Sequence, residues 1–143
     1  MANNKIPSLG FHHIAIQVKD FEREIEFYKA LGLRPYAKWT GGPNNEKDIM
    51  LLELGCNGMV EIFSLGTEDP SENNRFIHFA MHVDDVDAAY QVALDAGATP
   101  LKPPVVVPLA TSEPVKLTLN CAFVVAPGGY ELEFIRVLES KEA

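Results

Sequence analysis

The amino-acid sequence predicts an α+β fold made of two tandem βαβββ modules. The first observation is an internal repeat, because residues 76–85 resemble residues 11–20 at an offset of 65 residues. The second is that a strand pattern is followed by a helix pattern in both copies. At the 65-residue offset, six of the 23 positions from 13 to 35 are identical: His13/His78, Ala15/Ala80, Val18/Val83, Asp20/Asp85, Gly32/Gly97 and Pro35/Pro100. Such identities are expected when two segments share one fold.

The first module opens with a strand and a helix. Residues 11–18 alternate between an apolar face and a face that carries His13 and Gln17, which is the pattern of a strand. Asp20 is a typical helix N-cap, apolar residues follow it at helical spacing, and Gly32 suits a left-handed C-terminal stop. Three strands are then expected between turns, at residues 36–39, 49–54 and 59–63.

The second module repeats this plan, with a strand at residues 76–83, an N-cap at Asp85 and a stop at Gly97. The polar segment 66–74 is expected to link the modules. A proline-rich stretch is expected to form a surface loop in place of the first-module hairpin: Pro100, Pro103, Pro104, Pro108 and Pro114. The last two strands are expected at residues 117–125 and 130–137. We therefore expect one domain over residues 1–143, with modules 11–65 and 76–138.

Composition narrows the class of protein. The chain has 143 residues, of which 47% are apolar and 22% charged, and this is ordinary for one globular domain. The net charge of -8 and the lack of a basic run argue against a nucleic-acid partner. No apolar run approaches the roughly 20 residues of a spanning helix, and no signal-type segment follows the start, so we expect no membrane partner and a cytoplasmic location. Cys56 and Cys121 stand at unmatched places, which argues against a disulfide framework.

Matched carboxylates lie on the last strand of each module. Aligning the preceding turns places Glu61 against Glu133, each between apolar neighbours that face the opposite way. A carboxylate aimed inward on a strand is costly unless it is paired or binds a metal. His13 and His78 lie on the equivalent face of the first strands, so the two modules would bring two imidazoles and two carboxylates together. Such donors suit one divalent ion of Ni, Co, Zn, Fe or Mn.

Other residues compete for these roles. His12 alternates onto the face that packs against the helix, Glu131 shares a face with Glu133 but lies nearer the turn, and Glu53 is expected to face solvent. A metal-free binding cup, in which His13 and His78 are simply hydrogen-bonded, is the alternative to a metal centre.

At these residues the chain resembles the vicinal oxygen chelate superfamily, which includes glyoxalases, bleomycin-resistance proteins and extradiol dioxygenases. Four motifs carry the resemblance: H-I-A-I-Q-V-K-D with Phe27-Tyr28, V-E-I-F, H-F-A-M-H-V-D-D-V-D-A-A and P-G-G-Y-E-L-E-F. The resemblance covers nearly all of residues 11–138. It implies a cup-shaped, curved mixed sheet, the glyoxalase-like fold, with His13, Glu61, His78 and Glu133 as the metal ligands.

The resemblance also implies a reaction. In a lactoylglutathione-lyase type of enzyme, glyoxalase I, a proton moves next to a carbonyl through a metal-stabilised enediolate, and Glu61 and Glu133 would be the acid/base pair. Methylmalonyl-CoA epimerase is the alternative isomerase. Glyoxalase I usually has an arginine and an asparagine where this chain has Gln17 and Leu65, and this departure argues against glutathione as cosubstrate.

Two other classes remain open. An Fe(II) extradiol dioxygenase would use His13, His78 and Glu133, but a fourth donor at Glu61 argues against it because oxygen needs that space. A non-catalytic drug- or metabolite-binding protein would line its cup with aromatic side chains: Trp39, Phe63, Phe123 and Tyr130.

The expected partners are a small-molecule substrate and a second copy of the chain in a homodimer. Gln17 and His82 lie four residues after the two histidines, roughly 13 Å along each strand. We expect them to contact substrate without binding the metal. The two modules could meet within one chain or across the dimer.

Overall fold

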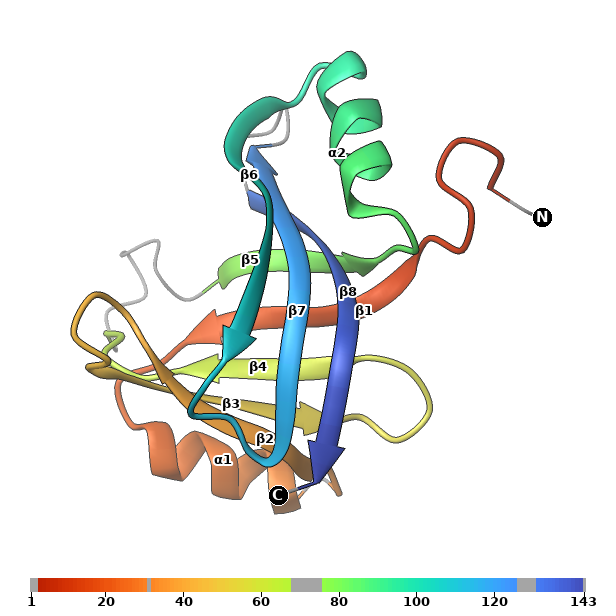
Figure 1. Ribbon diagram of the computed structural model, residues 1–143. Coiled ribbons are helices and arrows are strands. Elements are labelled where there is room, and N and C mark those ends of the chain that lie inside the picture. Colours follow the sequence, from red (N-terminus) through yellow and green to blue (C-terminus); the bar gives the residue numbers. More distant parts are fainter. Residues whose placement is uncertain (1–2, 31, 68–75, 126–130, 143) are drawn as a thin grey trace.

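The computed structural model describes residues 3–30, 32–67, 76–125 and 131–142. Within these residues, two helices and eight strands follow one another in the order βαβββ, twice, as the predicted two-module fold class requires (Figure 1). The elements are β1 (Gly10–Gln17), α1 (Phe21–Ala30), β2 (Arg34–Gly41), β3 (Lys47–Glu53), β4 (Met59–Phe63), β5 (Phe76–His82), α2 (Val86–Asp95), β6 (Thr99–Leu109), β7 (Glu113–Val125) and β8 (Glu131–Glu142).

The eight strands of the described ranges belong to one curved sheet, in the order β2-β3-β4-β1-β5-β8-β7-β6. The pairs β1–β4 and β5–β8 are parallel and the other pairs are antiparallel, so the sheet is mixed as expected. The antiparallel pair β1–β5 joins the modules at the centre, and β6, β7 and β8 rise across the strands of the first module (Figure 1). A short extra pairing of β2 with β7, at Ala37 and Pro114, draws the two halves together into a cup.

The two faces of the sheet have different roles. One face packs against the helices: α1 lies on a cluster that includes Leu52 and Ile62, and α2 lies on one that includes Val124 and Phe134. The other face lines the inside of the cup. Because alternate residues of a strand face opposite ways, Ile14 of β1 packs towards α1 and leaves its neighbours on the inner face.

Helix ends follow the sequence signals. The Asp20 carboxylate accepts a hydrogen bond from the Arg23 backbone N–H at 3.1 Å, and the Asp85 carboxylate accepts one from the Ala88 N–H at 3.0 Å. These side chains satisfy N–H groups that a helix cannot satisfy itself. Gly32, with φ of +100°, and Gly97, with φ of +111°, adopt the left-handed conformation that was predicted at the helix ends.

The expectation of a proline-rich loop after Gly97 is wrong. Residues 99–109 form strand β6, which is paired with β7 and lies at one end of the sheet order. An edge strand tolerates proline, since the missing N–H can face solvent. The β6–β7 pairing shifts register between Pro100 and Lys102, and again between Lys102 and Val105, where Pro103 and Pro104 interrupt it. Strand β7 likewise begins earlier than expected, at Glu113.

Three further expectations concern the linker, the cysteines and membrane-spanning helices. Residues 68–74 of the expected linker lie outside the described residues. Both cysteines are free, Cys56 exposed and Cys121 buried, in agreement with the expected absence of a disulfide framework. Of the helices in the described ranges, neither has the length and apolar character needed to cross a membrane.

Candidate metal centre

Four neighbouring strands each supply one of the predicted ligands. Glu61 lies on β4, His13 on β1, His78 on β5 and Glu133 on β8, and these strands are adjacent in the sheet. The strand register explains how they meet. Ala15 is paired with both Glu61 and His78.

Ala80 has the equivalent position in the second module, because it is paired with both Glu133 and His13. Ala15 and Ala80 are fully buried. An alanine between two ligands in each module leaves room for the longer side chains to converge above it. This placement accounts for the identical alanines in the sequence repeat.

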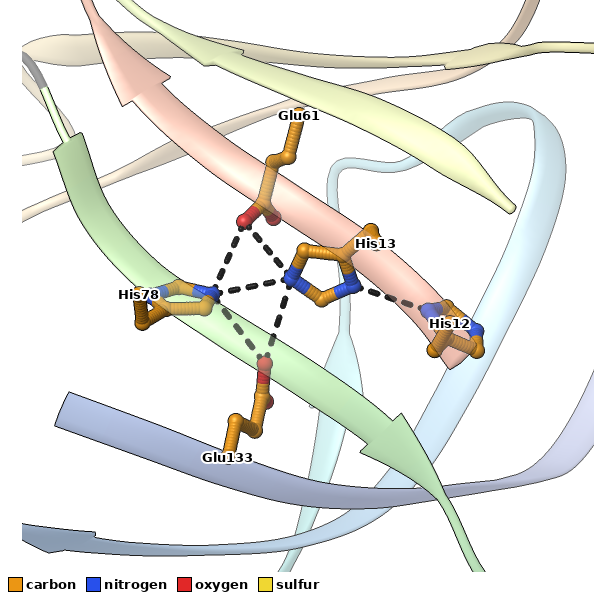
Figure 2. A network of polar contacts seen from close by, with 5 residues as sticks. All are labelled: His12, His13, Glu61, His78 and Glu133. Carbon is orange, nitrogen blue, oxygen red and sulfur yellow. Dashed lines mark hydrogen bonds and ion pairs between the residues drawn. The ribbon is translucent and has the colours of Figure 1, made fainter. Parts of the chain in front are cut away.

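The donor atoms converge on one point (Figure 2). His13 Nε2 and His78 Nε2 are 2.8 Å apart. Glu61 Oε1 lies 3.1 Å from His13 Nε2 and 3.3 Å from His78 Nε2. Glu133 Oε1 lies 3.3 Å and 3.2 Å from the same two atoms. Figure 2 shows the two carboxylates on opposite sides of the pair of imidazoles, as the relation between the modules requires.

These residues fit a divalent ion by three observations. The donor atoms of His13, Glu61 and His78 all lie within 4.8 Å of one another. Two imidazole nitrogens only 2.8 Å apart need a proton or a cation between their lone pairs. Glu61 Oε1 is buried and, among the described residues, has no partner in hydrogen-bond geometry although it lies at ion-pair distance from both imidazoles. The oxygen is therefore aimed at the common centre, where a cation would satisfy it.

The electrostatics of the cluster point the same way. Burial alone would lower the pKa of His13 and His78, but Glu61 and Glu133 outweigh it and raise the pKa to about 10 for His13 and about 9 for His78. Burial alone would raise the pKa of Glu61, yet the two histidines lower it to about 2, and the pKa of Glu133 is lowered for the same reason. Two buried carboxylates thus demand positive charge at this point, and an ion can replace the protons that supply it.

The expected position of His12 on the helix-packing face is wrong. Its ring is buried on the inner side of the cup, and His12 Nδ1 lies 2.8 Å from His13 Nδ1 (Figure 2). The cause is a register shift in the β1–β5 pairing between Phe11 and His13, which breaks the alternation on which the expectation rests. Burial, helped by the neighbouring His13, lowers the pKa of His12 to about 4.

A cavity of about 380 Å³ opens over the four donors. Its described lining is largely apolar, with Lys102 as its one lysine or arginine. The predicted aromatic side chains Trp39, Phe63 and Phe123 line it, whereas Tyr130 lies outside the described residues. Strand β6 contributes lining residues that the loop interpretation missed: Lys102, Val105, Val107 and Leu109. The alternation of the last three was the available sequence signal.

The structure does not bring Gln17 and His82 to this cavity, since neither belongs to its described lining. The Gln17 side-chain amide donates to the Ser64 carbonyl oxygen at 3.0 Å and borders a separate hollow of about 540 Å³ beside α1. Four residues along a strand carry a side chain roughly 13 Å from the donors, which is enough to leave the cup. Their substrate contacts stay an untested prediction that this placement does not favour.

Comparison with known proteins agrees with this architecture. The chain is 30% identical over 132 residues to a protein of Vibrio cholerae named probable lactoylglutathione lyase, covering 87% of this chain and 88% of that one. The fold is similar to that of a hypothetical protein of Bacillus halodurans, with a TM-score of 0.69 and 23% identity over 95% of this chain and 99% of the other. It is also similar to a methylmalonyl-CoA epimerase of Streptomyces coelicolor, with a TM-score of 0.68 and 20% identity over 92% and 100% of the two chains.

A family model covers most of the chain, matching residues 10–134, and these residues include the first module, nearly all of the second and all four donors. The chain therefore belongs to the glyoxalase/bleomycin resistance protein/dioxygenase superfamily.

Proposed function

We propose that this protein is a metal-dependent lyase or isomerase that moves a proton next to a carbonyl group, of the lactoylglutathione-lyase type. The observation that carries the proposal is the convergence of two imidazoles and two carboxylates, one of them with an unsatisfied buried oxygen, at the floor of an apolar cavity. The name of the Vibrio cholerae relative supports the same class of reaction.

The residues divide the work as follows. A divalent ion held by His13, His78 and the two glutamates would supply a Lewis acid that stabilises negative charge on the substrate oxygen. Glu133 takes the proton from the carbon next to the carbonyl and later releases it to water. Glu61, on the other side, gives the adjoining carbon a proton that it has first taken up from water. The largely apolar walls keep most water away from the donors, which strengthens these electrostatic interactions.

The cavity also suggests the kind of substrate. Its apolar walls favour a compact apolar body, and Lys102 favours an anionic group near strand β6. Lys102 Nζ lies 5.3 Å from the centre of the Phe123 ring, and this ring in turn meets His78 edge-on. A substrate that binds through its carbonyl at the donors could thus place a carboxylate or phosphate near Lys102. Acyl-CoA epimerisation uses the same proton chemistry and is the alternative substrate class.

The decisive experiment is deuterium uptake from heavy water under anaerobic conditions. The reconstituted protein should exchange the proton next to the carbonyl in a hemithioacetal or an acyl-CoA substrate, because abstraction needs a base and a Lewis acid but no oxygen. Glu133→Gln should lower the rate by at least about 100-fold, the effect of losing a general base. Glu139→Gln is the matched control, since Glu139 is an exposed carboxylate on the same strand and pairs with Lys141 at 2.6 Å.

Two results would contradict the proposal. Oxygen consumption with a catechol, without deuterium uptake, would indicate a dioxygenase. Tight binding of a small apolar compound with neither reaction would indicate a binding protein. The proposal includes action as one domain over residues 1–143, as a homodimer in the cytoplasm; limited proteolysis, size-exclusion chromatography and cell fractionation test these three points.

A further inference from the structure

Strand β1 contains one more residue than its partner β5 at the edge of the donor cluster. Phe11 is paired with Met81 and His13 with the next residue, Ala80, so His12 is the inserted residue of a β-bulge. In a regular strand His12 would face away from His13. The bulge breaks this alternation and turns a side chain, which is a common use of bulges beside functional sites.

The side chain of His12 contacts His13, a predicted metal ligand, at the ring nitrogen that faces away from the donor cluster. His12 Nδ1 lies 2.8 Å from His13 Nδ1, while His13 Nε2 points to the donor cluster (Figure 2). The two rings meet edge to face, with their centres 5.0 Å apart and their planes at 77°. At 2.8 Å one nitrogen must donate a proton and the other must accept it.

Only one direction of this hydrogen bond is compatible with an ion at the cluster. A histidine ligand binds through an unprotonated nitrogen, so His13 must leave Nε2 free and carry its proton on Nδ1. His13 Nδ1–H then donates to His12 Nδ1, and the proton of His12 resides on Nε2. The opposite direction would leave neutral His13 protonated at Nε2, where the proton would block the ion.

We propose that His12 is a positioning residue, whose Nδ1 accepts the hydrogen bond from His13 and fixes the tautomer and ring orientation that make His13 a metal ligand. This inference rests on the proposed metal-dependent function. Groups that accept a hydrogen bond from a metal-binding histidine orient the ring and increase its basicity. Here an imidazole fills a position that carboxylates and backbone carbonyls commonly fill.

The second module provides an internal comparison. Strand β5 has its own inserted residue at Ile77, because Ile16 is paired with Phe76 and Ala15 with His78. The two bulges thus precede the two histidine ligands at matching places. The first module carries an imidazole there, and the second carries an aliphatic side chain that cannot accept a hydrogen bond. His12→Ile therefore gives β1 the residue that β5 already accommodates at this place.

The test compares His12→Ile with His12→Gln, whose amide oxygen can accept the same hydrogen bond. Affinity for Zn²⁺ and Co²⁺ is measured by competition with a chelator, and thermal unfolding of each metal-free variant reports on the fold. We expect His12→Ile to bind about 10- to 100-fold more weakly than the unaltered protein. We expect His12→Gln to recover most of the affinity. Equal affinity of His12→Ile and the unaltered protein, or no recovery with His12→Gln, would overturn the proposal.

A second readout is independent of metal affinity. Nitrogen-15 NMR of the histidine rings should show the proton of His12 on Nε2, both in the metal-free and in the Zn²⁺-loaded protein, and a hydrogen-bonded Nδ1–H on His13. A His12 ring protonated at Nδ1 would overturn the inference, and this measurement decides alone if neither variant folds. Failure of the unaltered protein to bind any ion would instead refute the proposed function, while the ring protonation would still decide the direction of the hydrogen bond.

Discussion

Removal of the His78 imidazole tests the ligand set most directly. His78 Nε2 lies within 3.3 Å of donor atoms from His13, Glu61 and Glu133, and the ring is buried. His78→Ala takes away one of four donors but leaves the backbone of β5 intact. The matched control is His82→Ala, which removes a half-buried imidazole from the same strand, outside the described lining of the cavity.

The size of the effect follows from binding linkage. An ion present at 1,000 times its dissociation constant stabilises the native state by about 4.1 kcal/mol. Loss of a group that merely orients a ligand weakens metal binding by about 10- to 100-fold, so loss of His78 itself should weaken binding by at least about 100-fold. The same ion concentration is then only about 10 times the dissociation constant, and the stabilisation falls to about 1.4 kcal/mol.

Thermal unfolding with and without the ion measures this difference. For a chain of about this size each kcal/mol moves the Tm by about 2–4 °C, so the ion-induced rise should fall from roughly 8–16 °C to roughly 3–6 °C. Comparing each variant with its own metal-free form cancels any direct effect of the substitution on stability. His82→Ala should keep the full rise. A full rise in both His78→Ala and His13→Ala, or its loss in His82→Ala, would refute the ligand assignment.

Three further predictions concern the core, the thiols and the cavity. Ile62→Ala, at a fully buried position under α1, should lower the free energy of unfolding by about 2–5 kcal/mol in a denaturant titration, whereas Leu54→Ala at an exposed position should change it far less. Burial, helped by the nearby Glu133, raises the pKa of the Cys121 thiol to about 11, so at pH 8 a thiol reagent should modify exposed Cys56 quickly and Cys121 slowly, and the Cys121 rate should rise as the pH approaches 11. Lys102→Gln should raise the KM for anionic substrates and leave that for neutral analogues nearly unchanged, and equal effects on both would argue against an anion contact.

The sequence alone determined the repeated plan and indicated which four side chains would converge. Asp20, Asp85, Gly32 and Gly97 mark helix ends through local chemistry, in which a side chain or a left-handed backbone satisfies groups within a few residues. The repeat also showed which strand of one module corresponds to which strand of the other, and this did not require knowledge of their contacts. Because successive side chains of a strand face opposite ways, this correspondence also indicated that the four donor side chains would lie on the same face of the sheet.

Tertiary structure decided the features that depend on a neighbouring strand, namely the formation of β6 and the positions of His12 and Gln17. The prolines of β6 made its alternating strand pattern difficult to recognise in the sequence. They are tolerated because, among the described strands, β6 is paired on one side only. His12 left the helix-packing face because β5 has one residue fewer to set against β1 at that point. Gln17 has the right face but lies too far along its strand to reach the cup.

These differences share a physical cause. Periodicity reports how one strand alternates, but a bulge, an edge and the closure of the sheet arise from pairing between segments that are far apart in the chain. The donors could be predicted because both modules carry them at equivalent places. The position of His12 beside His13 and the residues that line the cavity depend on the register between strands. This register is defined only when the strands have paired.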